Sequence, residues 1–319
     1  MTMTRRERVL ELAHSGRRAD DVIPAAFFLH FPEEFHRGRP AVEKHVEYFR
    51  ATGNDIMKIQ YEHKFPPLDS IRRSHDWTDV PCYDESFYAD QLEVIGGIVE
   101  ELREEAVVIV TLYSPFMFAG QTVGKEALLR QFTDDPEAVR RGLEIIVESM
   151  GHFIRGCIDR GVDGFYASTQ GGEKDRLPTG VFEEYVKPTD LAVWNMFTDR
   201  TTCNVLHVCD YEAPYESFDT YTDYPGHIVS APNEVNGRPV SGRDIADLFG
   251  RPFLGGMERL GVISGGPRDA VPQAAREAIR SGPDAMMLGA DCTLSASTDW
   301  ANIAAATEVA HSWLESEGR

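Results

Sequence analysis

The chain has 319 residues, of which 42% are hydrophobic and 26% charged, a composition typical of a soluble globular protein with a sizeable core. Its net charge of −20 argues against nucleic acid and anionic membranes as partners, because both require a basic surface. No apolar run reaches the roughly 18–20 residues that cross a bilayer, and the charged N-terminus lacks a signal-peptide core. We therefore expect a cytoplasmic protein. Its five cysteines predict metal binding or simple burial rather than a disulfide framework.

Short apolar runs alternate with longer amphipathic segments along the chain. A capping-box pattern at Thr4 and Glu7 predicts a first helix over 5–14. Later periodic segments predict helices after Pro40, from Lys125, and over 86–105, 136–160, 181–198 and 300–315. Eight apolar runs predict strands: 22–29, 55–60, 107–112, 164–168, 204–209, 227–230, 252–256 and 285–290. Strands that alternate with helices predict a parallel α/β sheet, and eight of them predict a (β/α)8 TIM barrel.

We expect a single barrel domain over 1–319, with an N-terminal helix. An open doubly wound sheet is the alternative, but no Gly-rich phosphate-binding fingerprint follows the first predicted strand. The Pro- and Asp-rich stretch 65–85 predicts a lid or an extra loop over the barrel mouth.

The strand ends carry the residues with the most specific chemistry. Alternate residues of a strand project from the same face, so His207 and Cys209 at the end of the fifth predicted strand are expected to lie together. Cys292 follows the eighth predicted strand and belongs to the same rim of the barrel. One imidazole nitrogen and two thiolates suit Zn²⁺, and three protein ligands leave a fourth position for a substrate. The alternative is a buried strand histidine with two unreactive thiols.

Other strand ends supply further candidates. Tyr166 is a candidate catalytic residue that could donate a hydrogen bond to a substrate, and the alternative is that it caps the barrel core. Glu258 is a second catalytic candidate, and Glu258, Asn233 or Glu234 could supply a fourth zinc ligand. The candidates for substrate binding are His30, Ser114, Tyr166 and Asn233. No chemical role is expected for Cys82, Cys157 and Cys203.

Two segments resemble a known family. Leu206-His207-Val208-Cys209 resembles the His-x-Cys element of the zinc-dependent methylcobamide:coenzyme M methyltransferases, which belong to the uroporphyrinogen-decarboxylase superfamily. The segment 288–292 and the helix expected from Asp299 resemble the closing Cys element of those enzymes. The resemblance implies a (β/α)8 barrel, a zinc ion and activation of a thiol. Asp210 stands where the family has glycine, and it adds bulk and charge beside the metal ligands.

The first hypothesis is therefore zinc-dependent methyl or alkyl transfer to a small-molecule thiol. A free thiol has a pKa of about 8.5, and binding to Zn²⁺ releases its proton and leaves a nucleophilic thiolate. The acceptor thiol stays open between coenzyme M, homocysteine and another metabolite. The family implies a methylcorrinoid donor, and because the chain lacks an Asp-x-His-x-x-Gly segment, a corrinoid is expected as a free cofactor or on a separate protein. The resemblance also allows a homodimer.

Two other functions are open at the level of sequence. A cofactor-free decarboxylase of a porphyrinogen or another carboxylated substrate needs converging arginines. The segment after the first predicted strand instead contains Glu33 and Glu34, which would repel carboxylates. The remaining hypothesis is a non-catalytic barrel that binds zinc or a small ligand.

Overall fold

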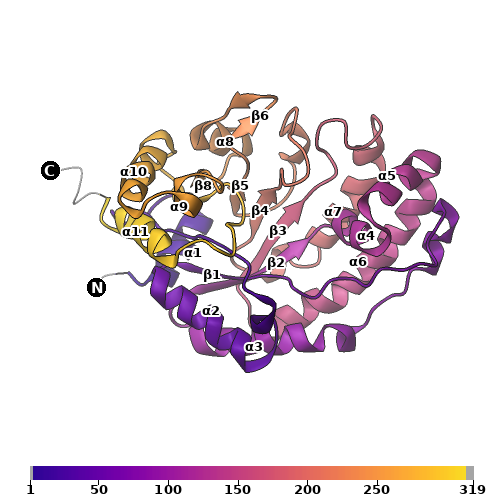
Figure 1. Cartoon of the computed structure of the whole chain (residues 1–319), viewed down its shortest axis with the longest axis horizontal. Helices are drawn as coiled ribbons and strands as arrows, with labels where there is room; N and C mark the ends of the chain where they lie inside the picture. Colours follow the sequence, from indigo (N-terminus) through magenta and orange to yellow (C-terminus); the bar gives the residue numbers. More distant parts are fainter. Residues whose placement is uncertain (1–2, 314–319) are drawn as a thin grey trace.

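Seven parallel strands form a curled sheet at the centre of the molecule, in the order β1-β2-β3-β4-β5-β8-β9 (Figure 1). The structure is a computed structural model, and it describes residues 3–313. The strands are β1 (Ile56–Ile59), β2 (Val107–Tyr113), β3 (Gly164–Thr169), β4 (Val205–Val208), β5 (Ile228–Ser230), β8 (Phe253–Met257) and β9 (Met286–Ala290). A separate antiparallel hairpin consists of β6 (Glu234–Val235) and β7 (Arg238–Pro239). The predicted parallel α/β sheet is confirmed.

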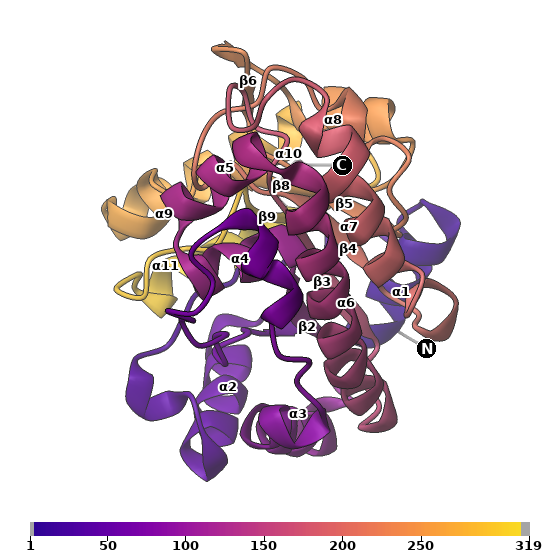
Figure 2. The same cartoon turned by 90° about the vertical axis from the view of Figure 1, so that its right-hand side faces the viewer.

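Helices surround this sheet and follow one another around its outer side (Figures 1 and 2). In the described part of the chain, α2 contacts α3, α3 contacts α6, α6 contacts α7, and α10 contacts α11, which in turn contacts α2. The helices are α1 (Arg5–Ser15), α2 (Gly38–Thr52), α3 (Ala89–Leu102), α4 (Pro115–Val123), α5 (Lys125–Asp134), α6 (Pro136–Asp159), α7 (Lys187–Trp194), α8 (Gly242–Phe249), α9 (Val262–Gly265), α10 (Val271–Ser281) and α11 (Trp300–His311). None of these described helices has the length and apolar character needed to cross a bilayer. The predicted helix 300–315 ends at His311, and positions 314 and 315 lie outside the described residues.

The strands are apolar on both faces because each face packs in a different core. Val108 and Val110 of β2 pack in one core, whereas the alternate residues Val107 and Ile109 pack in the other. The second core also contains Val9 of α1, the helix that begins with the predicted capping box. Burial on both faces explains why the strand sequences are nearly continuous in apolar residues.

The first predicted strand, 22–29, does not form a regular strand, so a complete ring of eight regular strands is not present among the described residues. Pro24 lacks the N–H group that a regular ladder would use. The segment makes isolated parallel pairings with β9 and with the residues that follow it. On its other edge, the side chains of Asn54 and Asp55 accept main-chain N–H groups. The segment therefore lies between β9 and β1, held by single contacts.

The stretch 65–85 contains a 3-10 turn, Ser74–Asp79, that packs against α6. Trp77 is fully buried in this turn, and its indole N–H donates a hydrogen bond of 2.8 Å to Gln131 Oε1. These contacts account for the tryptophan in this stretch. Movement of 65–85 as a lid stays a prediction.

Gly164 at the start of β3 has no room for a side chain. A Cβ atom there would lie 1.9 Å from the main-chain oxygen of Cys203. A change of side-chain rotamer cannot relieve this clash, because the clashing atom belongs to the main chain. We expect Gly164→Ala to lower the free energy of unfolding by roughly 3 kcal/mol or more, measured by urea denaturation. Gly265→Ala is the matched control, because a Cβ at Gly265 meets nothing within 4 Å. Equal stability of the two variants would contradict the prediction.

Candidate metal centre

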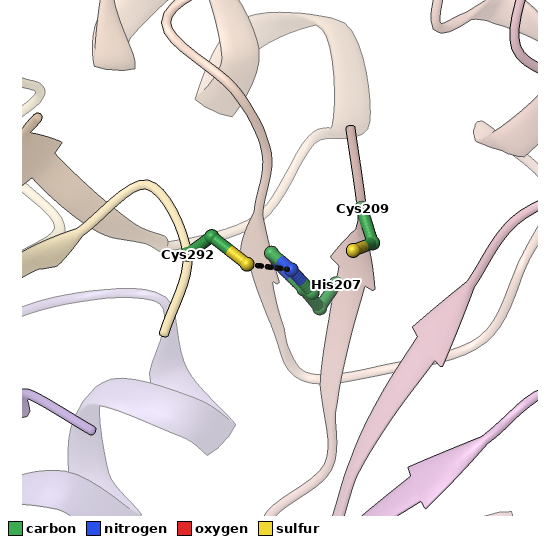
Figure 3. Close-up of side chains that lie close together, drawn as sticks. All are labelled: His207, Cys209 and Cys292. Atoms are coloured by element: carbon green, nitrogen blue, oxygen red, sulfur yellow. Dashed lines mark hydrogen bonds between the residues drawn. The ribbon is translucent and has the colours of Figure 1, made fainter. Parts of the chain in front are cut away.

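The strand ends bring one histidine and two cysteines together. His207 lies in β4, Cys209 directly follows that strand, and Cys292 comes two residues after β9. Their ligand atoms all lie within 4.8 Å of one another, and Cys292 Sγ is 3.4 Å from His207 Nε2. Figure 3 shows that Cys292 approaches from the loop after β9, facing the two residues at the end of β4. The predicted ligands therefore form one cluster, and their binding of a metal stays a prediction.

The curl of the sheet positions this cluster. β5 and β8 lie between β4 and β9 in the sheet order, so the two ligand-bearing strands are not neighbours. His207 is in register with Ser168 of β3 and Ser230 of β5. The N–H of Asp291 donates a hydrogen bond of 2.9 Å to Met257 O, which extends the β8–β9 pairing to the residue before Cys292. Regular pairing thus fixes both strand ends, and curvature makes them meet.

Neighbouring side chains orient the buried imidazole of His207. Its Nδ1 lies 3.3 Å from the hydroxyl of Ser230, which leaves Nε2 facing Cys292. The same hydroxyl lies 3.4 Å from the Tyr166 hydroxyl, and the Tyr166 ring centre is 4.9 Å from that of His207. Burial raises the pKa of Tyr166, so its hydroxyl keeps its proton and can donate it in a hydrogen bond. A fixed second nitrogen is the usual arrangement for a metal-binding histidine.

The two thiols influence each other's protonation. The Cys292 thiol, as hydrogen-bond partner, lowers the pKa of Cys209 despite the burial of that sulfur. The same interaction, together with burial, raises the pKa of Cys292. Gln170 Nε2 also donates a hydrogen bond of 3.4 Å to Cys209 Sγ. The pair therefore favours a state with one thiolate and one thiol, and a cation at this position would stabilise the second thiolate as well.

The donor set fits Zn²⁺. One imidazole nitrogen and two sulfurs converge from rigid strand ends, and they are borderline and soft donors of the kind that zinc binds. All three residues also line a cavity, so a fourth position faces open space rather than a fourth protein ligand. Such an open position is typical of catalytic rather than structural zinc sites.

Arg259 joins the two segments that carry the thiols. Its Nη1 donates a hydrogen bond of 3.0 Å to Asp210 Oδ1, beside Cys209. Its main-chain N–H donates to Asp291 Oδ1 at 2.7 Å, beside Cys292, and Nη1 lies 3.8 Å from the other Asp291 oxygen. The charge of Asp210, which is unusual for the resembled family, is thus neutralised by Arg259.

A cavity of about 680 Å³ opens in front of the cluster. Of the other predicted site residues, His30 and Tyr166 line it. His30 Nδ1 lies 2.8 Å from Glu62 Oε1, and Glu62 lines the cavity as well. The cavity wall also includes Gln60, Tyr61, Tyr113, Phe116, Met117, Gln170, Arg176 and Arg259. Its size suits a small organic substrate.

Three predicted site residues are not brought to this cavity. The Ser114 hydroxyl accepts a hydrogen bond from Met117 N and caps α4, so the Ser-Pro pair begins a helix. Asn233 precedes the β6–β7 hairpin, and its main-chain oxygen accepts from Val240 N. Glu258 is exposed in the turn after β8. None of the three is among the residues that line the cavity.

Lys58 is a cavity residue that was not among the predicted site residues. It projects from β1 and only 5% of its surface is exposed. Its Nζ donates to Gln60 Oε1 at 3.1 Å and lies 4.6 and 4.4 Å from the ring centres of Phe28 and Tyr166. Burial lowers the pKa of Lys58 to about 7. Its position at a strand end was the only signal in the sequence.

The fold and the cluster define a protein of TIM-barrel type with a buried His/Cys/Cys group at the carboxyl ends of its strands. The family model described as Uroporphyrinogen decarboxylase (URO-D) matches residues 57–313. The chain therefore belongs to the uroporphyrinogen decarboxylase family, which confirms the superfamily resemblance.

Solved structures that share the fold include the following two. A methyltransferase from Methanosarcina mazei superposes with a TM-score of 0.74 at 14% identity, covering 98% of this chain and 100% of that chain. A B12-independent methionine synthase from Shewanella sp. W3-18-1 has a TM-score of 0.59 at 10% identity, covering 93% and 100%. At such low identity, these likenesses establish the fold alone. A search of curated proteins found no match.

Proposed function

We propose that the protein transfers a methyl or other alkyl group to the sulfur of a small-molecule thiol, with Zn²⁺ held by His207, Cys209 and Cys292. The observation that carries this proposal is the convergence of three metal-ligand atoms within 4.8 Å at the wall of a cavity of about 680 Å³. When bound, Zn²⁺ lowers the pKa of a coordinated thiol, so that a thiolate is available at neutral pH. Two solved structures of this fold are named a methyltransferase and a methionine synthase, which supports transfer to sulfur.

The residues around the cluster perform the remaining tasks. Ser230 holds the imidazole of His207, and Tyr166 supplies a hydroxyl donor beside it. His30, paired with Glu62 at the cavity wall, accepts the proton that the substrate thiol releases. The substrate sulfur then forms a bond to the alkyl carbon, while the bond to the leaving group breaks and its electron pair departs with that group.

The donor that we propose is a methylcorrinoid, presented free or by a separate protein. Transfer from it leaves the electron pair of the carbon–cobalt bond on cobalt. A centre with two cysteine sulfurs suits the reducing cytoplasm, where we place the protein.

Decarboxylation of a carboxylated substrate is the second candidate function. The observation that favours it is the group of basic side chains at the cavity wall, which includes Lys58, Arg176 and Arg259. This reaction has no use for a His/Cys/Cys cluster. Carbon dioxide release by Cys209→Ser protein would therefore favour decarboxylation over alkyl transfer.

A methyl-transfer assay on the zinc-loaded protein tests the main proposal. Methylcobalamin is mixed with a panel of thiols that includes coenzyme M and homocysteine. We expect loss of the methylcobalamin absorbance and an S-methyl product detected by mass spectrometry. We also expect about one zinc ion per chain by elemental analysis. A protein that is purified and reconstituted with zinc but retains none of it would overturn the proposal.

A further inference from the structure

Lys58 is a buried amine without a carboxylate partner in the described part of the chain. It projects from β1, lines the cavity in front of the metal centre, and has only 5% of its surface exposed. Glu62 lines the same cavity, but its carboxylate lies 2.8 Å from His30 Nδ1 and forms no ion pair with the lysine. Lysines are almost never fully buried unless they are paired. A structural ion pair therefore does not explain this lysine.

The hydrogen bonds around Lys58 fit a neutral amine better than an ammonium. Nζ donates one hydrogen bond, of 3.1 Å, to Gln60 Oε1, and that oxygen also accepts from Thr111 Oγ1 at 3.0 Å. Gln60 Nε2 donates to Leu29 O at 3.1 Å, which fixes the orientation of the amide. An ammonium has three N–H groups to satisfy, whereas residues 3–313 offer it this single acceptor. A neutral amine needs only the one partner and retains a lone pair for use as a nucleophile.

Two aromatic rings flank the amine without compensating a full positive charge. Nζ lies 4.6 Å from the ring centre of Phe28 and 4.4 Å from that of Tyr166. A cation over an aromatic ring gains about 0.5–2 kcal/mol, whereas removing an ammonium from water costs several kcal/mol. The desolvation cost is the larger of the two, so this environment favours the uncharged form.

The titratable groups near Lys58 do not reverse this balance. Glu62, Cys209 and Cys292 all act to raise the pKa of Lys58, but burial outweighs them and lowers it to about 7. At neutral pH about half of the molecules then carry an uncharged amine at this position, compared with roughly one in a thousand for an ordinary lysine. A lysine in a desolvated pocket is one of the recognised forms of an activated nucleophile.

We propose that Lys58 is a nucleophile that binds a small aldehyde or ketone covalently as an imine. The amine nitrogen forms a bond to the carbonyl carbon, and the electron pair of the C=O π bond moves to the oxygen. Both amine hydrogens then leave with that oxygen as water, and a C=N double bond remains, so the step needs no oxidant or reductant. A cavity of about 680 Å³ accommodates a small organic carbonyl compound. This chemistry uses neither the metal nor a thiol.

Reductive trapping tests the proposal on the full chain at pH 7.5. The protein is incubated with acetone, butanal or benzaldehyde, and sodium borohydride then adds hydride to an imine carbon and leaves a stable secondary amine. Peptide mapping by mass spectrometry locates the alkylated lysine. With at least one probe we expect Lys58 to be alkylated roughly tenfold or more faster than Lys64, an exposed lysine at the same cavity wall.

Lys58→Met should abolish this rapid alkylation, and Lys58→Arg should do so while keeping a cation. Lys64→Met is the matched control and should retain it. The proposal is overturned if no probe alkylates Lys58, if Lys58 and Lys64 react at equal rates, or if rapid alkylation persists in Lys58→Met. Mapping of the wild type locates the reactive lysine even if a variant does not fold. Because trapping requires neither zinc nor a thiol, its failure and the failure of the proposed alkyl transfer are distinguishable.

Discussion

Cys209→Ser is expected to remove the bound zinc and to lower the rate of methyl transfer to a thiol by roughly a hundredfold or more. A serine hydroxyl keeps its proton at neutral pH and replaces a soft sulfur donor, so only two of the three ligands stay. His207→Ala and Cys292→Ser are expected to do the same, because all three ligand atoms lie within 4.8 Å of one another. Zinc content by elemental analysis and initial rates measure the effect.

Cys82→Ser is the control for the loss of a thiol. Cys82 is exposed and lies outside the cluster and the cavity wall, so this variant should keep its zinc and its rate. Ser230→Ala should retain the ligands but release His207 Nδ1, with an expected loss of about tenfold in zinc affinity. Zinc retained at full occupancy in well-folded Cys209→Ser and Cys292→Ser proteins would refute the assignment of the ligands.

Lys58→Met is expected to stabilise the metal-free protein by a few kcal/mol at pH 6.5. Burial lowers the pKa of Lys58 from 10.5 to about 7 in the folded chain. Between these two pKa values the unfolded chain binds a proton that the folded chain does not, so wild-type stability rises with pH there. Below pH 7 the folded protein bears the whole cost of a buried ammonium, and each pKa unit corresponds to about 1.4 kcal/mol.

Urea denaturation of wild type and Lys58→Met between pH 6.5 and 10.5 measures this effect. The advantage of the variant should be greatest at the lowest pH and should disappear as the pH approaches 10.5. Lys64→Met removes an exposed lysine from the same cavity wall and should leave stability close to the wild type throughout. A gap between wild type and Lys58→Met that does not change with pH would show that packing, and not the charge, causes it.

The ligand cluster could be predicted because simple rules fix it. The two-residue period of a strand puts His207 and Cys209 on one face, and the barrel rule puts Cys292 at the same rim. Seven of the eight predicted strands are regular strands of the sheet. The segment 22–29 has the apolar composition of a strand. Pro24 has no N–H group, however, and the side chains of Asn54 and Asp55 bind main-chain N–H groups that a neighbouring strand would otherwise bind. Strand propensity alone does not reveal such side-chain contacts.

Other parts of the site depend on tertiary packing that a single sequence does not reveal. Ser114 follows a strand, but the proline after it is typical of a helix start. The sequence alone could therefore have predicted that Ser114 caps a helix. Glu258 ends a strand too, but the turn after β8 leaves its side chain in solvent. Arg176 stands in a loop without any motif, and its burial at the cavity wall appears only in three dimensions.

The separation of β4 and β9 within the sheet would link metal supply to folding in a zinc-loaded protein. Two strands lie between them, so an ion held by His207, Cys209 and Cys292 would cross-brace the interior in addition to taking part in chemistry. Binding energy gained only by the folded chain adds to its stability by mass action. In a zinc-starved cell, newly made protein would then be less stable and shorter-lived, whatever the supply of substrate.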